Sequence, residues 1–254
     1  MKHQIGNSER KRRTPIRDNS DLVKLANSYT APPKTVEPKI QEPSKIIIPK
    51  DLTNSDYIAL NNQIFSIGLY ETNKNWYNQA KSTLEKGLQF QDVAQGMEMY
   101  KAIINAHQNK QTLFHPDGTN VHEKIISELY NLTQDNCQNL NARFKENNLM
   151  KKAPSLDSNK NLIYSESQII APKKDGYYNL EKINSQGFPI EKSKTQLFHK
   201  NNNIYVRAPI NGRVARLVSI NYDSILYCYD VPENNDASLG VRYSIVRGQG
   251  SDKK

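Results

Sequence analysis

The chain has 254 residues, a formal net charge of +9 and a hydrophobic content of 36%. This content and a mean hydropathy of −0.78 are low for a chain that folds throughout, so we expect part of it to be disordered. The composition excludes a helical membrane protein, because no stretch approaches the roughly 20 apolar residues of a membrane span.

Residues 1–51 form the first region, which we predict to be a disordered, basic, proline-rich arm. Six of the twelve prolines lie in residues 1–50, where 11 Lys and Arg stand against 5 Asp and Glu, a net charge of +6. The remaining residues hold 24 against 21, a net charge of +3, so the basic charge is concentrated in the arm. Prolines at this spacing favour extended, solvated backbone. The polar start from Met1 to Arg13 also predicts no secretory signal.

A cluster of basic residues within the arm has two interpretations. Lys and Arg on a flexible arm neutralise phosphates without reading sequence, so the cluster can associate with nucleic acid or act as a localisation signal. It can equally be a solvated tail. The residues that the nucleic-acid interpretation assigns are Arg10, Lys11, Arg12, Arg13 and Arg17.

The folded body is expected at residues 52–248, as one α+β domain followed by a tail at residues 249–254. The alternating segment Gln63 to Tyr70 predicts a first strand. Trp76, Ala80 and Leu84 then share one face of a helix that Gly87 ends. We expect Trp76 and Leu84 to be core residues, together with Leu239 and Val241 near the C-terminal end.

Two more helices are expected before the chain turns to strands. The second spans residues 91–108, with an apolar stripe that ends near His107. The third begins with a capping-box-like pair, Asn120 and Glu123, and continues through Leu132.

The rest of the body is expected to be mainly β. Residues 137–144 alternate as a strand does, whereas residues 145–160 are polar and predict a loop. Short strand-like segments follow, and Asn211-Gly212 between two of them predicts a β-hairpin. Helices followed by such a run of strands predict an α+β fold with two or three helices packed on a small antiparallel sheet.

No motif for catalysis or for a cofactor is present, so the sequence predicts a protein that is not an enzyme and needs no cofactor. A phosphate-binding loop, a dinucleotide-binding glycine motif and an HExxH metal motif are all missing. Two cysteines, Cys137 and Cys228, are too few for a disulfide framework and predict a reduced, cytoplasmic location. Cys228 shares its strand face with Leu226, which favours a core role over a nucleophile.

Two places in the sequence bring possible metal ligands together, and no metal is predicted at either. His115 and His122 flank a turn, but a metal there needs further ligands from the fold. Four carboxylates lie close in sequence, and hard oxygen ligands of this kind can hold calcium. Their spacing fits loop solvation better. They are Asp223, Asp230, Glu233 and Asp236.

Two stretches carry a resemblance to a known family. The stretch "NWYNQAKSTLEKGLQFQDVAQGMEMY", Asn75 to Tyr100, resembles the first two helices of proteins with the C-type-lectin fold of the formylglycine-generating-enzyme-like kind. The ending "ASLGVRYSIV", Ala237 to Val246, is similar to the final strand of that fold and to the ends of variable proteins of diversity-generating retroelements. The resemblance implies a C-type-lectin-like scaffold. The catalytic cysteine pair of the formylglycine-generating enzymes has no match here, so oxidase chemistry is not implied.

The resemblance also implies a site. In such variable proteins the region before the final strand forms the exposed ligand surface, and adenine-directed mutagenesis diversifies it. Transferred by position, the ligand-binding residues are Asn221, Tyr222, Asp223, Ser224, Tyr227, Tyr229, Asp230, Asn234 and Asn235. Tyr offers rigid contact area, and Asn and Ser offer adaptable hydrogen bonds, as in antibody paratopes. A high Asn content can also reflect an AT-rich genome, and both readings stay open.

The function expected from the sequence is therefore non-enzymatic binding of a protein or other macromolecular ligand at a C-terminal, diversified surface. The alternative is association with nucleic acid through the basic arm.

Overall fold

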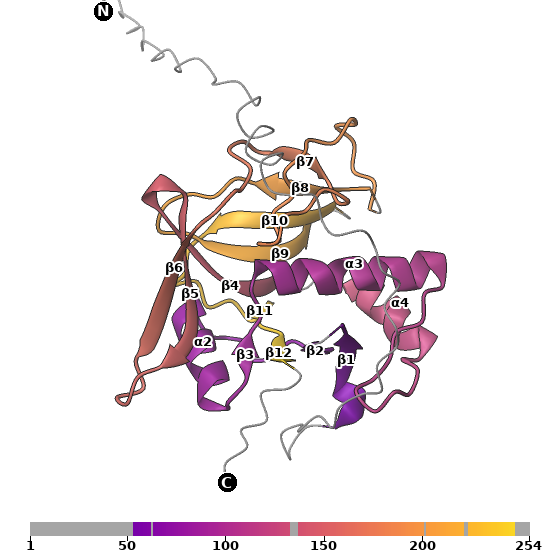
Figure 1. Ribbon diagram of the computed structural model, residues 1–254, viewed down its shortest axis with the longest axis horizontal. Helices are drawn as coiled ribbons and strands as arrows, with labels where there is room; N and C mark the ends of the chain where they lie inside the picture. Colours follow the sequence, from indigo (N-terminus) through magenta and orange to yellow (C-terminus); the bar gives the residue numbers. More distant parts are fainter. Residues whose placement is uncertain (1–52, 62, 133–136, 201, 221–222, 247–254) are drawn as a thin grey trace, which may run out of the picture. The chain divides into compact units, whose positions relative to one another are not determined.

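Three helices and two β-sheets make up the described part of the chain in the computed structural model, which covers residues 53–61, 63–132, 137–200, 202–220 and 223–246 (Figure 1). This content confirms the α+β class. The chain divides into two units, Met1–Pro38 and Lys39–Lys254. All described residues belong to the second unit. The arm and the C-terminal tail expected from the sequence lie outside the described residues.

The helices begin and end close to where the sequence predicts. They are α2 (Trp76–Glu85), α3 (Val93–Asn109) and α4 (Glu123–Leu132), and two short 3-10 turns, η1 (Asn54–Asp56) and η2 (Glu146–Asn148), accompany them.

Local capping explains the ends of the helices. The Asn75 side chain caps α2, and Gly87 follows its end with a φ of 72°. A capping box between Asp92 and Gln95 starts α3. The expected capping box of α4 does not form. Asn120 instead forms a β-bridge to Phe114, while the backbone of the neighbouring His122 accepts the first helical hydrogen bonds.

The smaller sheet brings together strands from both ends of the described region. Its order is β1 (Tyr57–Leu60), β2 (Gln63–Ser66), β12 (Tyr243–Val246) and β3 (Gln89–Phe90). β12 runs antiparallel to both of its neighbours.

The larger sheet is mixed rather than small and antiparallel. Its order is β6 (Leu162–Gln168), β5 (Leu149–Leu156), β4 (Cys137–Lys145), β9 (Val214–Ile220), β10 (Asp223–Asp230), β8 (Asn203–Arg207) and β7 (Gly176–Asn179), and β11 (Leu239–Gly240) pairs in parallel with β4. β8 and β10 are parallel neighbours, so β8 and β9 do not form the hairpin predicted from Asn211-Gly212. The turn itself forms, with a φ of 79° at Gly212.

The prediction of a loop at residues 145–160 is wrong. β5 lies within this range and pairs with β6, which begins at Leu162, as an antiparallel hairpin (Figure 1). Only Met150 and Ala153 of β5 are buried, and this explains why residues 145–160 lack the run of apolar residues that marks a buried strand.

One face of the larger sheet packs against α3. Leu226 and Cys228 of β10 and Val206 of β8 are completely buried there, in one cluster with Val93 and Met97 of α3. On the opposite face, α2 and β3 cover the part formed by β5, β4 and β9. Trp76 is buried there and donates through Nε1 to the Leu140 carbonyl at 2.8 Å. Leu239 and Val241 are also buried, as expected, and Leu84 is half-buried against the same cluster.

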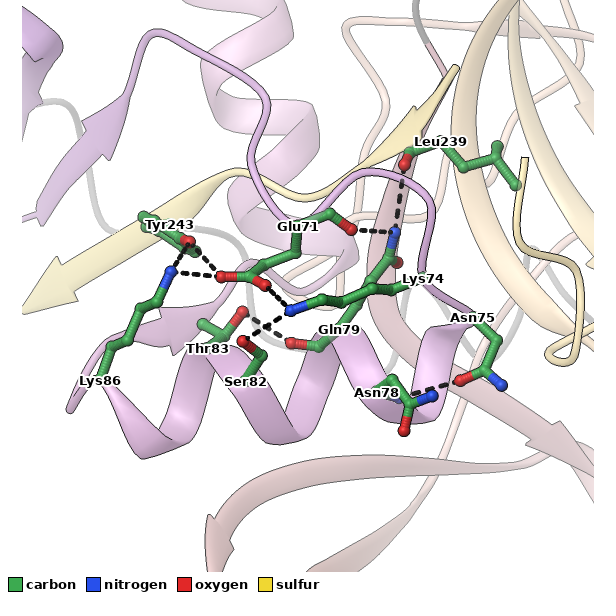
Figure 2. Close-up of polar contacts among 10 residues, drawn as sticks. All are labelled: Glu71, Lys74, Asn75, Asn78, Gln79, Ser82, Thr83, Lys86, Leu239 and Tyr243. Carbon is green, nitrogen blue, oxygen red and sulfur yellow. Dashed lines mark hydrogen bonds and ion pairs between the residues drawn. The ribbon is translucent and has the colours of Figure 1, made fainter. Parts of the chain in front are cut away.

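A buried carboxylate fixes the C-terminal segment to α2 (Figure 2). Glu71 is only 4% exposed and contacts Lys74 Nζ at 2.6 Å and Lys86 Nζ at 2.5 Å. The Tyr243 hydroxyl donates to the same carboxylate at 2.8 Å. Burial alone raises the pKa of Glu71, but hydrogen bonds from Lys74, Lys86, Ser82 and Tyr243 outweigh it and lower the pKa to about 2. With every donor engaged in holding an ionised carboxylate, this cluster is structural.

Candidate functional site

The candidate site is a group of aromatic and basic side chains on the larger sheet, on the face opposite α3. Side chains alternate between the two faces of a strand, so the neighbours of the buried residues of β7, β8 and β10 point to this second face. The aromatic and basic side chains among these neighbours are partly exposed. We call the group the tyrosine face, and it consists of Tyr177, Tyr205, Arg207, Tyr227 and Tyr229.

The rings of the tyrosine face contact one another in pairs. Tyr227 and Tyr229, two residues apart on β10, stack with ring centroids 4.3 Å apart and planes at 28°. Tyr177 and Tyr205 meet edge to face with centroids 5.0 Å apart. Packed aromatic pairs of this kind hold each other in fixed orientations.

Arg207 joins the two pairs. Its guanidinium carbon lies 5.5 Å from the Tyr205 ring centroid and 5.6 Å from that of Tyr229. Asp175 fixes the arginine from the other side, at 2.8 Å from Nη1, and also accepts from the Ala208 backbone N–H. The hydrogen bond that Arg207 donates to Asp175 raises the pKa of Arg207, so the cation persists at every physiological pH.

The strand beneath the rings packs against the core on its other face. Leu226 and Cys228 alternate with the tyrosines of β10 and are fully buried on the α3 side. Burial raises the pKa of the Cys228 thiol far above its ordinary value, so this cysteine has no nucleophilic character. The interpretation of Cys228 as a core residue is confirmed.

Asp230 lies at the end of β10 and is turned toward the interior. It forms an ion pair with Arg216 of β9, and Arg216 Nε donates to Asn139 Oδ1 at 2.5 Å. Asn139 donates in turn to Gln79 of α2, also at 2.5 Å. Burial lowers the pKa of Arg216 to about 10. Because its carboxylate pairs with Arg216, Asp230 supports the end of the strand that carries the tyrosine face, and its role in binding a ligand stays a prediction.

The loop at residues 231–238 continues from β10 and borders the tyrosine face. Asn234 and Asn235 are exposed at its tip. The loop is held at both ends, because the Pro232 carbonyl accepts from the Trp76 N–H at 2.9 Å and the Ser238 carbonyl accepts from the Cys137 N–H at 3.3 Å.

The remaining predicted site residues lie elsewhere or outside the described part. Ser224 is 3% exposed and faces α3, because it has the same parity along β10 as Leu226; this corrects the prediction. Asn221 and Tyr222 lie outside the described residues, and the side chain of Asp223 is not described. The basic cluster at residues 10–17 also lies outside the described residues.

Sequence reasoning missed Tyr177, Tyr205 and Arg207. Each alternates with a buried neighbour, Tyr178 or Val206, so the period of two was a usable signal for their outward direction. The signal that places them beside Tyr229 is the parallel pairing of β8 with β10, which no local pattern reveals.

Metal ligation is not supported in the part of the chain that the structure describes. No group of three or more His, Cys, Asp or Glu side chains lies close enough there to hold an ion. His115 Nδ1 bonds to the Tyr57 carbonyl at 2.8 Å, and His122 Nδ1 accepts from the Lys124 N–H at 3.1 Å. Both histidines are thus engaged with backbone. None of the described helices has the length and apolar character needed to cross a membrane.

No family model, curated protein or solved structure matches the chain.

Proposed function

We propose that this protein is a non-enzymatic binding protein whose tyrosine face, with the loop at residues 231–238, contacts a macromolecular ligand. The observation that carries the proposal is the packed set of four tyrosines around Arg207 on the larger sheet. The proposal includes a cytoplasmic location, which the two free cysteines support.

A protein ligand suits the chemistry of this surface. Tyrosine and arginine are the residues that contribute most often to binding energy at protein interfaces. A tyrosine that neighbouring rings already hold in place loses little conformational entropy on binding. The exposed Asn234 and Asn235 at the border add donors and acceptors that adapt to a partner.

Site-specific photo-crosslinking tests the proposal. A photoreactive residue is placed at Tyr205 and, in a second chain, at Tyr164 of β6, and partners captured in the source cells are identified. Tyr164 is the matched control, because it is also half-buried on a strand and lies beside a cation, with Lys151 Nζ 5.4 Å from its ring centroid. We expect a partner that is captured from position 205 and not from position 164.

The captured partner is then titrated against purified variants. Tyr205→Ala and Tyr229→Ala are expected to weaken binding at least tenfold, as hot-spot residues do, while Tyr164→Ala leaves affinity within about twofold. Equal affinities for all three variants would show that the tyrosine face is not the binding surface.

We further propose that the scaffold is C-type-lectin-like and that codons near residues 221–235 are diversified by a retroelement. The support is the resemblance of residues 75–100 and 237–246 to that family. Sequencing the surrounding DNA tests the second part: a nearby near-copy of the region that differs only at adenines, beside a reverse transcriptase gene, is the expected finding. If both are missing, diversification is ruled out and the binding surface is not affected.

Association with nucleic acid remains the alternative proposal. It rests on the charge of the arm, since Arg10, Lys11, Arg12, Arg13 and Arg17 lie outside the described residues. Replacing these five residues with alanine is expected to abolish DNA binding whose affinity falls steeply with salt. Unchanged DNA binding in that variant would exclude the arm.

A further inference from the structure

A small cavity lies on the α3 side of the larger sheet, away from the tyrosine face. Its volume is about 40 Å³, enough for a water molecule or a few heavy atoms. Its walls come from α3, from β4, β9 and β10, and from the segments before α2 and between β11 and β12. The apolar part of the lining consists of Leu69, Gly96, Met99, Ile103, Leu217 and Val218.

The polar part of the lining is dominated by hydrogen-bond donors. It consists of Tyr100, Gln138, Ser224 and Arg242, and each of these residues is at least nine-tenths buried. The hydroxyls of Tyr100 and Ser224 lie near each other, and neither has a partner of good hydrogen-bonding geometry among the described residues. Gln138 is held in place by its bond to Gln91 Oε1 at 2.8 Å.

Arg242 is the charged member of this set. Val241 and Tyr243 on either side of it pack toward α2, so Arg242 points the opposite way, to the cavity. It is 8% exposed, and among the described residues the hydrogen bond of its side chain goes to the Ile67 carbonyl. No carboxylate of the described residues pairs with it, although a guanidinium has five N–H donors. A buried charge without a counter-charge is strongly unfavourable, and burial accordingly lowers the pKa of Arg242 to about 10.

We propose that this cavity binds a small monovalent anion, a halide or a short carboxylate, which Arg242, Tyr100 and Ser224 hold. A guanidinium and two hydroxyls can all donate to one anion, and such charge-assisted bonds are the strong ones. The cavity volume limits the ligand to a few heavy atoms. The anion supplies the counter-charge that Arg242 lacks. The site is separate from the proposed function, because it lies on the other face of the sheet.

Thermal unfolding at constant ionic strength tests the site. Sodium gluconate, whose anion is too large for the cavity, is replaced stepwise by sodium chloride in one series and by sodium acetate in another. A ligand that binds only the folded state raises Tm, and we expect a saturable rise of about 2–4 °C in at least one series. Saturation by chloride identifies a halide site, and saturation by acetate alone identifies a carboxylate site.

Substitutions separate specific binding from a general salt effect. Arg242→Gln is expected to abolish the rise, whereas Arg213→Gln, at a half-buried arginine outside the cavity lining, keeps it. Tyr100→Phe and Ser224→Ala remove one hydroxyl each with little change of shape and are expected to weaken the apparent anion affinity at least threefold. Tyr229→Ala keeps the anion response, so failure here is distinguishable from failure of the tyrosine face.

Crystals grown in sodium bromide give a direct readout that does not depend on any variant. An anomalous scattering peak beside the Arg242 guanidinium is expected if the site takes a halide, and acetate density there if it takes a carboxylate. The proposal is overturned if neither series shows a saturable rise in Tm or if Arg242→Gln responds to the anions as the unsubstituted protein does.

Discussion

Arg216 and Asp230 form an ion pair between β9 and β10 at the border of the tyrosine face, and the side chain of Arg216 is only 6% exposed. The pair joins the end of the strand that carries Tyr227 and Tyr229 to Asn139 on β4. The position of the loop at residues 231–238 therefore depends on an interaction within the sheet.

Removing Asp230 is expected to destabilise the fold. Asp230→Ala leaves the buried Arg216 without its counter-charge, which costs about 3–5 kcal/mol of unfolding free energy. Urea denaturation measures the loss. Glu233→Ala, three residues further on and exposed, is the control and is expected to change stability by no more than about 0.5 kcal/mol. Equal effects of the two substitutions would contradict a buried, coupled pair.

Stability should fall at acidic pH because of Glu71. Its pKa is lowered from 4.5 to about 2 in the folded state, so its stabilising contribution is present above pH 4.5 and is lost as pH falls toward 2. Because Lys74 and Lys86 are partly exposed, solvent screens their attraction to Glu71, and we expect its contribution to the free energy of unfolding to be about 2 kcal/mol. Urea midpoints measured between pH 6 and pH 3 should decline less steeply in Glu71→Gln than in the unsubstituted protein. If the urea midpoints of both proteins fell equally with pH, Glu71 would not contribute to the loss of stability in acid.

Two glycines with the same backbone conformation should differ in their tolerance of alanine. Gly187 and Gly118 have φ values of 88° and 87°. A Cβ at Gly187 would lie under 3.0 Å from backbone atoms of Val93 and Ala94, whereas a Cβ at Gly118 meets nothing within 4 Å. Gly118→Ala therefore measures backbone strain alone, about 1–2 kcal/mol. Gly187→Ala is expected to cost clearly more in the same thermal unfolding assay, and a similar cost would show that the 187 loop moves away from α3 freely.

Tyrosines of the tyrosine face should matter less for stability than tyrosines of the core. Tyr229→Ala is expected to cost less than about 1.5 kcal/mol, because its ring is partly exposed. Tyr243→Ala removes a ring that is 1% exposed and a hydroxyl bonded to Glu71, and about 3–5 kcal/mol is expected. The two free energies of unfolding are compared by urea denaturation. If Tyr229→Ala were as costly as Tyr243→Ala, Tyr229 would be a structural residue.

Much of the helical structure could be predicted from the sequence, because the residues that mark a helix and its ends lie close together in the chain. The shared face of Trp76 and Ala80 and the end of the helix at Gly87 are both set within a few residues. β5 was not predicted, since only two of its side chains are buried, and its strand structure depends on pairing with β6.

The candidate site could be predicted only in part, because some of its residues lie far apart in the chain and come together through strand pairing. Tyr227 and Tyr229 follow from alternation within β10. Their neighbours Tyr205 and Arg207 join them through a parallel strand pairing, which depends on the order of strands in the sheet. The prediction for Ser224 was wrong for a different reason. The site residues were assigned by their position in the resembling family, and this disregarded the alternation that Leu226 and Cys228 already indicate along β10.

The place of β12 between β2 and β3 has a consequence for the order of events during synthesis. The Gln91 side chain donates to the Tyr243 carbonyl at 3.1 Å, and these residues are 152 positions apart. While the ribosome is still translating the intervening strands, β2 and β3 have no partner between them. The smaller sheet can close only after residue 246 has left the exit tunnel, so a nascent chain carries two open strand edges until then.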